Sequence, residues 1–234
     1  MKKNMLLTTA FVVLVGVGVF SYNYNPLGTS NSPQTDLSVS STTQEIPYSQ
    51  ETSLPTTESS ASIGKLYHND KEMFKEADIV ALVKVNEQEV VSHSDSLVTT
   101  KSQVSIEQAF KGKGPSGLLI SELGGPVDFS KIPDIGKSSD GKPKQTGVME
   151  TTIEGSTVMK KGHSYFVFLK QNPDAQWGYN ILGSVQGKFR YDDEKNMAVT
   201  TVAESHFKEE LFFLQKEHAG KGKKELVQYF NSLS

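Results

Sequence analysis

The sequence contains no cysteine. This absence excludes a disulfide scaffold, a cysteine-ligated zinc or iron–sulfur site, a catalytic thiol and a lipidated cysteine of the lipoprotein type. The chain also lacks an excess of positive charge, because 24 lysines and arginines stand against 27 aspartates and glutamates, and the isoelectric point is near 6.0. Nucleic-acid-binding domains are typically basic, so this balance argues against nucleic acid as a partner.

Local signatures of catalytic and metal centres are missing as well. No H-E-x-x-H occurs, and no two of the five histidines lie three to five residues apart, so a local zinc motif is absent. The glycine-rich turns at 112–117 and 220–224 do not fit the phosphate-binding pattern G-x-x-x-x-G-K-[ST], and no G-x-S-x-G elbow is present. The sequence therefore predicts no enzymatic activity, no cofactor and no metal site, and it places each histidine, His218 included, at the surface.

What the chain does have at its N-terminus is a short basic segment followed by an apolar run. Residues 1–4 carry two lysines, and residues 5–20 carry no charge. The run is longer than many signal-peptide cores and short of the roughly 20 residues that comfortably span a bilayer. Residues 1–21 are thus predicted to be a signal peptide or an N-terminal membrane anchor, which contacts the membrane through 5–20. The positive-inside rule then predicts an exported protein, either anchored on the outer face of the cytoplasmic membrane or secreted.

Residues 22–64 are rich in serine and threonine and poor in large apolar side chains and charges. Such a segment buries too little apolar surface to offset its chain entropy, so it is predicted to be a disordered linker. A spacer that carries a domain through a cell-wall layer and a tolerated low-complexity insert both agree with this composition.

The remainder of the chain alternates short apolar segments with turn signals and is long enough to bury a core. A short helix is expected near 69–77, because Asn69 or Asp70 can cap it. Strands are expected, in chain order, over residues 78–85, 97–110, 118–123, 148–153, 164–170, 179–182, 187–191 and 197–202. Apolar residues with helical spacing follow over 204–234. This order predicts an antiparallel barrel or sandwich over 65–203 and a C-terminal helical pair over 204–234.

Several short motifs occur in an order that resembles a known family. They are E-A-D-I-V-A-L-V-K-V at 76–85, F-K-G at 110–112, L-G-G at 123–125, G-H-S-Y-F-V-F-L at 162–169 and G-S-V-Q-G-K-F at 183–189. The set resembles a family of exported bacterial proteins with a double glycine, a G-E-x-Y-x-x-F-L strand and a Q-G-K-F strand. Members are sometimes found attached to or alongside secreted metalloproteases. The chain departs from the pattern at His163, where the family has an acidic residue. The resemblance implies a fold and carries no established activity.

A weaker similarity connects the chain with netrin-like modules and tissue inhibitors of metalloproteinases. There too an A-D-x-V first strand, as at 77–80, leads to a strand that ends in K-G, as at 111–112. Those relatives chelate the zinc of the protease through an N-terminal cysteine, which this chain lacks, so their mechanism of inhibition is not inherited. The similarity implies a mainly β fold, α+β overall: an OB-type or netrin-like antiparallel β-barrel with a short N-terminal helix and two C-terminal helices.

The first candidate binding surface is a long basic loop. Residues 127–147 are rich in glycine, proline, lysine and aspartate, and a structureless stretch of this length in a small domain is usually functional or mobile. Lys137, Lys142 and Lys144 lie in it and would suit anionic cell-wall polymers or lipid head groups. A solvated loop without a ligand is the alternative.

The second candidate surface lies near the Q-G-K-F motif. Lys188 and Arg190 would share one face of a strand, opposite Phe189 and Tyr191. That face would be either a ligand groove or the polar side of a strand whose aromatic residues lie in the core. Trp177, the single tryptophan, is a third candidate, either as an exposed loop aromatic for binding or as a side chain packed over a barrel end.

These features favour a non-enzymatic binding module at the cell envelope, tethered to the membrane, that recognises a protein or an anionic wall polymer through loops at one end of the barrel. The alternative is an inhibitor-like modulator of a secreted protease, acting through an edge strand or a loop without chelating metal. An envelope hydrolase is the weakest alternative.

Overall fold

The structure is a computed structural model that describes residues 47–61, 63–93, 97–131 and 147–233. All of these belong to one compact unit, residues 44–234. The expected membrane segment, most of the expected linker, and Lys137, Lys142 and Lys144 lie outside the described residues, so these interpretations stay predictions. In the described part of the chain, no helix is both long enough and apolar enough to cross a membrane.

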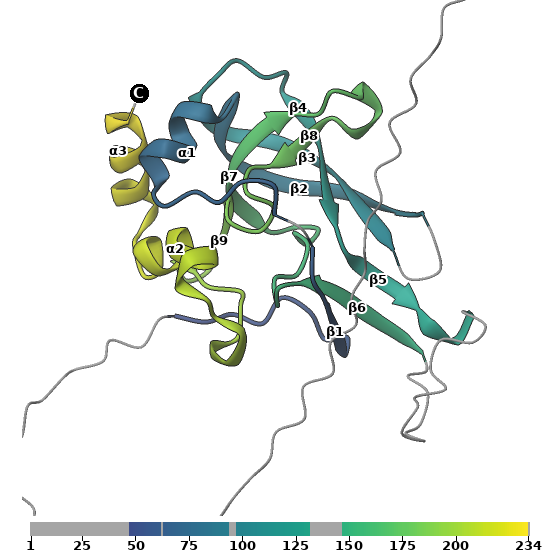
Figure 1. Ribbon diagram of the computed structural model, residues 1–234. Helices are drawn as coiled ribbons and strands as arrows, with labels where there is room; N and C mark the ends of the chain where they lie inside the picture. The colour runs from purple at the N-terminus through teal and green to yellow at the C-terminus, as the bar shows by residue number, and fades with distance from the viewer. Residues whose placement is uncertain (1–46, 62, 94–96, 132–146, 234) are drawn as a thin grey trace, which may run out of the picture. The chain divides into compact units, whose positions relative to one another are not determined.

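Five strands close into a barrel (Figure 1). They are β2 (Ile79–Ser92), β3 (Val98–Lys111), β4 (Gly117–Leu123), β7 (Ser164–Gln171) and β8 (Tyr179–Ile181). Around the ring the order is β2-β3-β4-β8-β7, and β7 pairs again with β2. This closed barrel confirms the predicted mainly β fold. The one departure from an antiparallel ring is the pair β4–β8, which is parallel.

Strand β7 has two partners along one of its edges. Its first half, residues 164–167, pairs with β9 (Lys188–Asp192), whereas its end, residues 169–171, pairs with β8. Strand β10 (Met197–Val199) then pairs with β9 and extends the sheet beyond the barrel. The strongest strand signal in the sequence, S-Y-F-V-F-L-K, therefore lies at the branch point of the sheet.

A second, three-stranded sheet has the order β1-β6-β5. Its strands are β1 (Thr56–Ser59), β5 (Gly125–Asp128) and β6 (Val148–Ile153). The sequence predicts β6 but not β5, because glycine and proline at its start are turn signals. Gly125 is needed there for a specific reason: its φ is +125°, and a Cβ atom would lie 2.2 Å from Thr100 Oγ1.

The prediction of a disordered linker up to residue 64 is wrong for residues 47–61, which pack on the folded unit. Strand β1 pairs in parallel with β6, and Tyr48 forms a β-bridge with Thr200. The Glu51 carboxylate is buried, with 1% of its side chain exposed. Composition did not predict that this segment is ordered, because strand pairing and a buried ion pair hold it in place and it buries few apolar side chains of its own.

Three helices lie on one side of the barrel: α1 (Asp70–Glu76), α2 (Glu209–His218) and α3 (Lys223–Ser232) (Figure 1). Of the two residues expected as possible caps, Asn69 caps α1, since its Oδ1 accepts a hydrogen bond from the backbone N–H of Glu72 at 2.9 Å. Helix α2 is shorter than expected, because residues 204–206 form a separate 3₁₀ turn.

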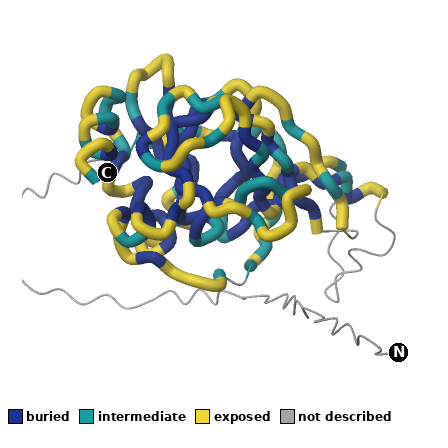
Figure 2. The backbone as a smooth tube through the Cα atoms, turned by 90° about the horizontal axis from the view of Figure 1, so that it is seen from above, coloured by how far each residue is buried: buried dark blue, intermediate teal, exposed yellow. Residues whose placement is uncertain are grey.

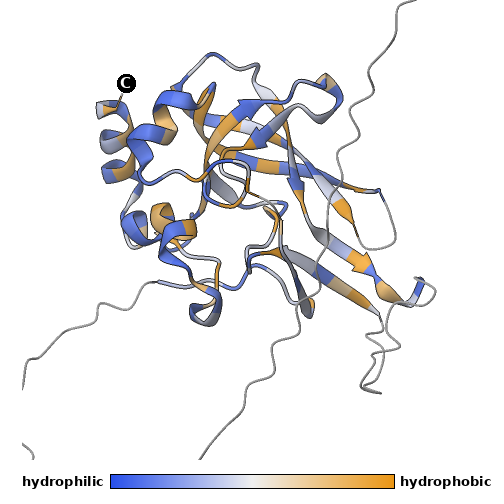
Figure 3. Cartoon of the chain, in the orientation of Figure 1, coloured by the Kyte–Doolittle hydropathy of each residue, from blue (hydrophilic) through white to orange (hydrophobic). Residues whose placement is uncertain are grey.

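Strand alternation divides the core into two layers. One set of side chains fills the barrel interior, including Ile79, Ala81 and Val83 of β2. Their neighbours Val80 and Leu82 point out of the barrel and pack beneath the helices. Figure 3 shows the resulting alternation of hydrophobic and hydrophilic residues along the strands, and Figure 2 shows the buried backbone enclosed by exposed segments.

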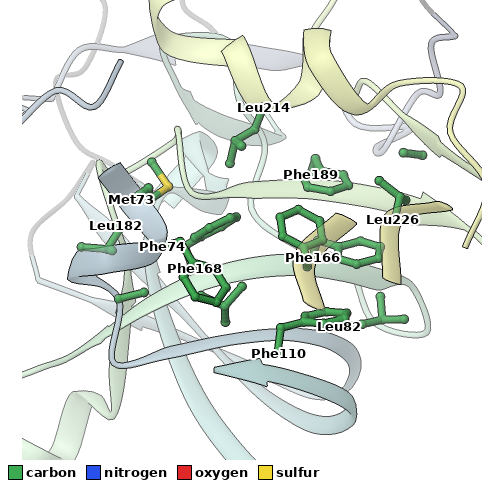
Figure 4. Packing of buried hydrophobic residues seen from close by; sticks show 14 of the residues in the cluster. Met73, Phe74, Leu82, Phe110, Phe166, Phe168, Leu182, Phe189, Leu214 and Leu226 are labelled. Atoms are coloured by element: carbon green, nitrogen blue, oxygen red, sulfur yellow. The ribbon is translucent and has the colours of Figure 1, made fainter. Parts of the chain in front are cut away.

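Aromatic rings dominate the layer beneath the helices (Figure 4). Phe166 of β7 stacks on Phe189 of β9 at 4.8 Å between ring centroids and on Phe230 of α3 at 5.4 Å. His218 at the end of α2 lies 5.2 Å from the Phe189 ring and is 1% exposed. The prediction that every histidine is at the surface is therefore wrong for His218, because the last residue of α2 packs into this aromatic layer.

Asp192 fixes the turn after β9, and its replacement tests this role. Its Oδ1 accepts hydrogen bonds from the backbone N–H groups of Glu194 at 3.2 Å and Lys195 at 3.1 Å. Burial alone would raise its pKa, but the Lys195 N–H and the nearby charge of Arg190 outweigh burial and hold the pKa below its usual value. A carboxyl whose pKa is lowered on folding stabilises the protein above its unfolded pKa of about 3.9, and this contribution is lost as pH falls through the folded pKa.

We therefore expect Asp192→Asn to lower the free energy of unfolding at pH 7 by on the order of 1 kcal/mol, the difference between a charged and a neutral acceptor. Urea unfolding at pH 7 and at several values below pH 5 measures the effect. The gap between parent and variant should close as pH falls, and a gap that stays constant would contradict the role of the charge.

Candidate functional site

Two barrel loops meet at one end of the molecule. His93 follows β2, at the connection between the first and second barrel strands, and Trp177 lies in the connection between β7 and β8. The centroids of their rings are 5.3 Å apart. Lys101 of β3 places its Nζ 4.3 Å from the centroid of the Trp177 ring. Trp177 is only partly buried, so this cluster forms part of the surface.

Short-range hydrogen bonds shape the loop that presents Trp177. Asn172 Oδ1 accepts from the N–H of Asp174 at 2.9 Å, and Asp174 Oδ1 accepts from the N–H of Gln176 at 3.1 Å. The loop then returns through Gly178, whose φ is +64° and where a Cβ atom would lie 2.2 Å from the carbonyl oxygen of Leu119. Only glycine fits this approach to β4, so the position of Trp177 is determined by the backbone.

Strand β4 anchors the same loop from the other side. Ser121 Oγ donates a hydrogen bond to the carbonyl oxygen of Trp177 at 2.7 Å. The parallel pairing between β4 and β8 is short, with two pairs in register: Ile120 with Tyr179, and Ser121 with Asn180. Beyond these pairs the two strands are not hydrogen-bonded to each other, and the surface between them is hollowed.

This hollow consists of two adjoining cavities of about 220 Å³ and 290 Å³. Both are lined by Ser121, Glu122, Leu123 and Asn180. We call these two adjoining cavities together the β4–β8 groove. The smaller cavity adds His93, Thr99, Asn172 and Trp177, and the larger adds Ala61, Ile153, Ser156, Ile181, Ser184, Val185 and Lys188. Two of the sequence-predicted site residues therefore line the groove, Trp177 in the smaller cavity and Lys188 in the larger one.

The charged residues in the groove compensate each other. Lys188 Nζ forms an ion pair with Glu122 and donates a hydrogen bond to the carbonyl oxygen of Thr157 at 2.6 Å. The other carboxylate oxygen of Glu122 accepts from the N–H of Met159 at 3.0 Å. Lys188 is 5% exposed, so it supports the floor of the groove and does not act as a free cation.

Arg190 shares a strand face with Lys188, as predicted, while Phe189 and Tyr191 lie in the core. It does not line the groove. Its Nη1 donates to Ser49 Oγ at 2.8 Å and lies 3.1 Å from Glu51 Oε1. Arg190 therefore holds the segment before β1 on the barrel.

Glu51 joins a second buried contact beside Arg190. The hydroxyl of Tyr165 donates to Glu51 Oε2, and burial together with the adjacent negative charge raises the pKa of Tyr165 well above its usual value. Tyr165 consequently stays a neutral hydrogen-bond donor at physiological pH. The contact supports the reading of Arg190 as a structural residue.

The groove offers polar groups and one aromatic ring in a nearly neutral surface. Its polar side chains are hydroxyls and amides, from Thr99, Ser121, Ser156, Ser184, Asn172 and Asn180. The groups with acid–base chemistry are already engaged: Glu122 with Lys188, and His93 Nε2 with Thr99 Oγ1 at 2.8 Å. This arrangement suits hydrogen bonding and stacking with a ligand more than proton transfer.

Sequence reasoning missed most of the groove. Ser121, Asn172 and Asn180 are ordinary strand and turn residues in the sequence, and no local motif marks them. The β7–β8 connection brings Asn172 and Asn180 together, and Ser121 joins them only when β4 pairs with β8. Of the six predicted site residues, Trp177 and Lys188 line the groove, Arg190 lies apart from it, and the three loop lysines lie outside the described residues.

Comparison with known proteins found no family model, no curated protein and no solved structure that matches this chain.

Proposed function

We propose that the protein is a non-enzymatic binding module that holds an extended polar ligand in the β4–β8 groove. The observation that carries this proposal is that two cavities adjoin along β4 and β8, where Ser121 and Asn180 line both of them. Trp177 lines one cavity and Lys188 lines the other. A chain-like ligand would occupy such a feature along its length, with Trp177 as an aromatic contact at one end.

The position of the groove on the barrel supports the same proposal. In OB-type barrels, ligands bind the face of the second and third strands and the loops that connect strands one to two and four to five. The corresponding parts here are β3, β4 and the loops that contain His93 and Trp177. The fold alone does not define a ligand, so the chemistry of the ligand has to follow from the residues in the groove.

The ligand we propose is a wall polymer that presents uncharged hydroxyl and amide groups. Hydroxyl and amide side chains line the groove, and its buried charges are paired. The expected export of the chain would place the groove in the cell envelope, where such polymers occur. A tethered domain would then bind the wall next to its own membrane.

A second candidate, modulation of a secreted protease, is favoured by one feature. Leu97 and Leu123 are 40% and 45% exposed, and Leu123 lines the groove. Exposed apolar side chains beside a groove suit a protein partner. Because the chain has no cysteine, it would bind a metalloprotease without coordinating the metal ion of the protease through a cysteine.

Trp177→Ala tests the proposal. We expect the variant to bind purified cell wall at least tenfold more weakly than the parent, because truncating a tryptophan that acts as a binding hot spot costs about 2 kcal/mol or more. Sedimentation of the full-length chain with purified wall gives the affinity. Tyr48→Ala is the matched control, since Tyr48 is an exposed aromatic residue that does not line the groove, and it should bind like the parent.

Two results separate the candidates. Wall binding that is lost in Trp177→Ala and retained in Tyr48→Ala supports the polymer. If the parent does not sediment with wall but captures a secreted protease through Trp177, the second candidate replaces the first. Equal binding by Trp177→Ala and parent would refute the groove as the binding site.

A further inference from the structure

Three potential metal ligands meet between α1 and α2, away from the groove. They are Asp70 at the start of α1, and Glu217 and His218 at the end of α2. One ligand atom from each lies within 4.8 Å of the others. Nearly 150 residues separate Asp70 from the other two in the sequence, so the packing of both helices on the barrel creates this cluster.

A buried imidazole nitrogen of His218 distinguishes this cluster from a group of surface carboxylates. Its side chain is 1% exposed, and within the described part of the chain its Nε2 makes no hydrogen bond. Buried polar atoms are normally hydrogen-bonded, so an unpartnered imidazole nitrogen needs an explanation. The ring is held in place by Phe189 and Phe230, with centroids at 5.2 Å and 5.3 Å.

The separation of the His218 and Asp70 ligand atoms is close to that of two ligands on one metal ion. His218 Nε2 lies 3.7 Å from Asp70 Oδ2, which is too long for a hydrogen bond. Two ligands that bind a tetrahedral zinc ion at 2.0–2.1 Å are about 3.3 Å apart. A small inward movement of the two side chains would bring both to bonding distance of a shared ion.

Charge and surroundings also agree with a divalent cation. Two carboxylates and a neutral imidazole carry a net charge of about −2, which a divalent ion would neutralise. The hydroxyl of Tyr229 donates a hydrogen bond to Asp70 Oδ2, an outer contact of the kind that orients metal-binding carboxylates. Glu217 is exposed, so its side of the cluster is open to solvent.

We propose that Asp70, Glu217 and His218 form a site for a divalent transition-metal ion, zinc being the best match to this ligand set. Three protein ligands leave one position for water. The ion would tie α1 to α2 over the aromatic layer of the core. This inference is independent of the function proposed for the groove.

The ammonium group of Lys221 would oppose binding of the ion. Its Nζ lies 3.5 Å from His218 Nδ1, on the opposite side of the ring from Asp70. Zinc on Nε2 requires the proton on Nδ1, so the Lys221 ammonium has to turn toward solvent when the metal binds. Lys221→Met is therefore expected to bind zinc more tightly than the parent.

The test is isothermal titration of the full-length chain, stripped with EDTA and held in mild detergent, with zinc chloride. We expect one saturable site. We expect Glu217→Gln to bind zinc at least tenfold more weakly, because the variant loses a negatively charged ligand. Glu217 is exposed, so its replacement does not disturb the core. Tyr229→Phe should weaken binding by about 10–100-fold as an outer contact. His206→Gln is the control, since His206 is a partly exposed histidine outside the cluster.

Zinc should also raise the melting temperature of the parent and of His206→Gln, and leave that of Glu217→Gln nearly unchanged. The proposal is overturned if the parent shows no saturable binding. It is also overturned if Glu217→Gln binds zinc like the parent, or if the control His206→Gln is the variant that loses the ion.

Discussion

Lys188→Met is expected to lower the free energy of unfolding by about 3–5 kcal/mol, the usual cost of breaking a buried ion pair from one side. The variant removes the cation that pairs with Glu122 and donates to the Thr157 carbonyl at 2.6 Å. Both side chains of the ion pair are less than a tenth exposed, so water does not replace the lost partner. Glu122 would remain as an uncompensated buried charge.

The double variant Lys188→Met/Glu122→Leu separates this electrostatic cost from a loss of packing. Replacing both members of a buried pair by apolar side chains of similar size is often nearly neutral, so we expect it to recover most of the lost stability. Urea unfolding of parent, single and double variants measures both effects. A single variant that costs less than 1 kcal/mol would mean that Lys188 is a free groove cation after all.

Phe230→Ala is expected to lower the free energy of unfolding by about 3–5 kcal/mol, the typical cost of truncating a buried phenylalanine. Phe230 is fully buried, and its ring contacts Phe166 of β7 and Phe189 of β9. The truncation would leave a cavity between α3 and the barrel, where the surrounding aromatic rings cannot close without leaving their own packing.

Asn231→Ala is the matched control on the same helix. Asn231 is exposed, and a surface substitution of this kind usually changes stability by no more than about 0.5 kcal/mol. The shape of the unfolding curve carries further information. We expect one transition for both variants, because α3 shares its core with the barrel. A separate early transition in Phe230→Ala would mean that the helices unfold independently of the barrel.

The sequence predicted the strands of the barrel well, because their signals are local. The run at 164–170 is aromatic and β-branched, and the glycine-rich turn at 112–117 ends the preceding strand. The cap of α1 was visible as Asn69 or Asp70, since a capping side chain acts within one helical turn, and the structure has Asn69 in this role.

The same local reasoning failed for segments whose order depends on distant partners. Strand β1 is polar and short, and it exists because β6, about ninety residues later, accepts it as a parallel neighbour. Lys188 could be read from sequence as a groove cation or as the polar side of a strand. The position of Glu122 beside it decided between these readings, and no spacing rule relates residues 122 and 188.

By itself, the sequence excluded chemistry that needs a cysteine, and it determined the alternation that builds the strands and the apolar spacing that builds the helices. These depend on composition and on periods of two or about 3.6 residues, which neighbouring residues carry. Only the tertiary structure decided where side chains from separate elements meet. The β4–β8 groove exists because two strands pair over two residues and then separate, and the cluster of Asp70, Glu217 and His218 exists because two helices pack on one barrel face. Both are products of long-range packing, which a linear pattern does not encode.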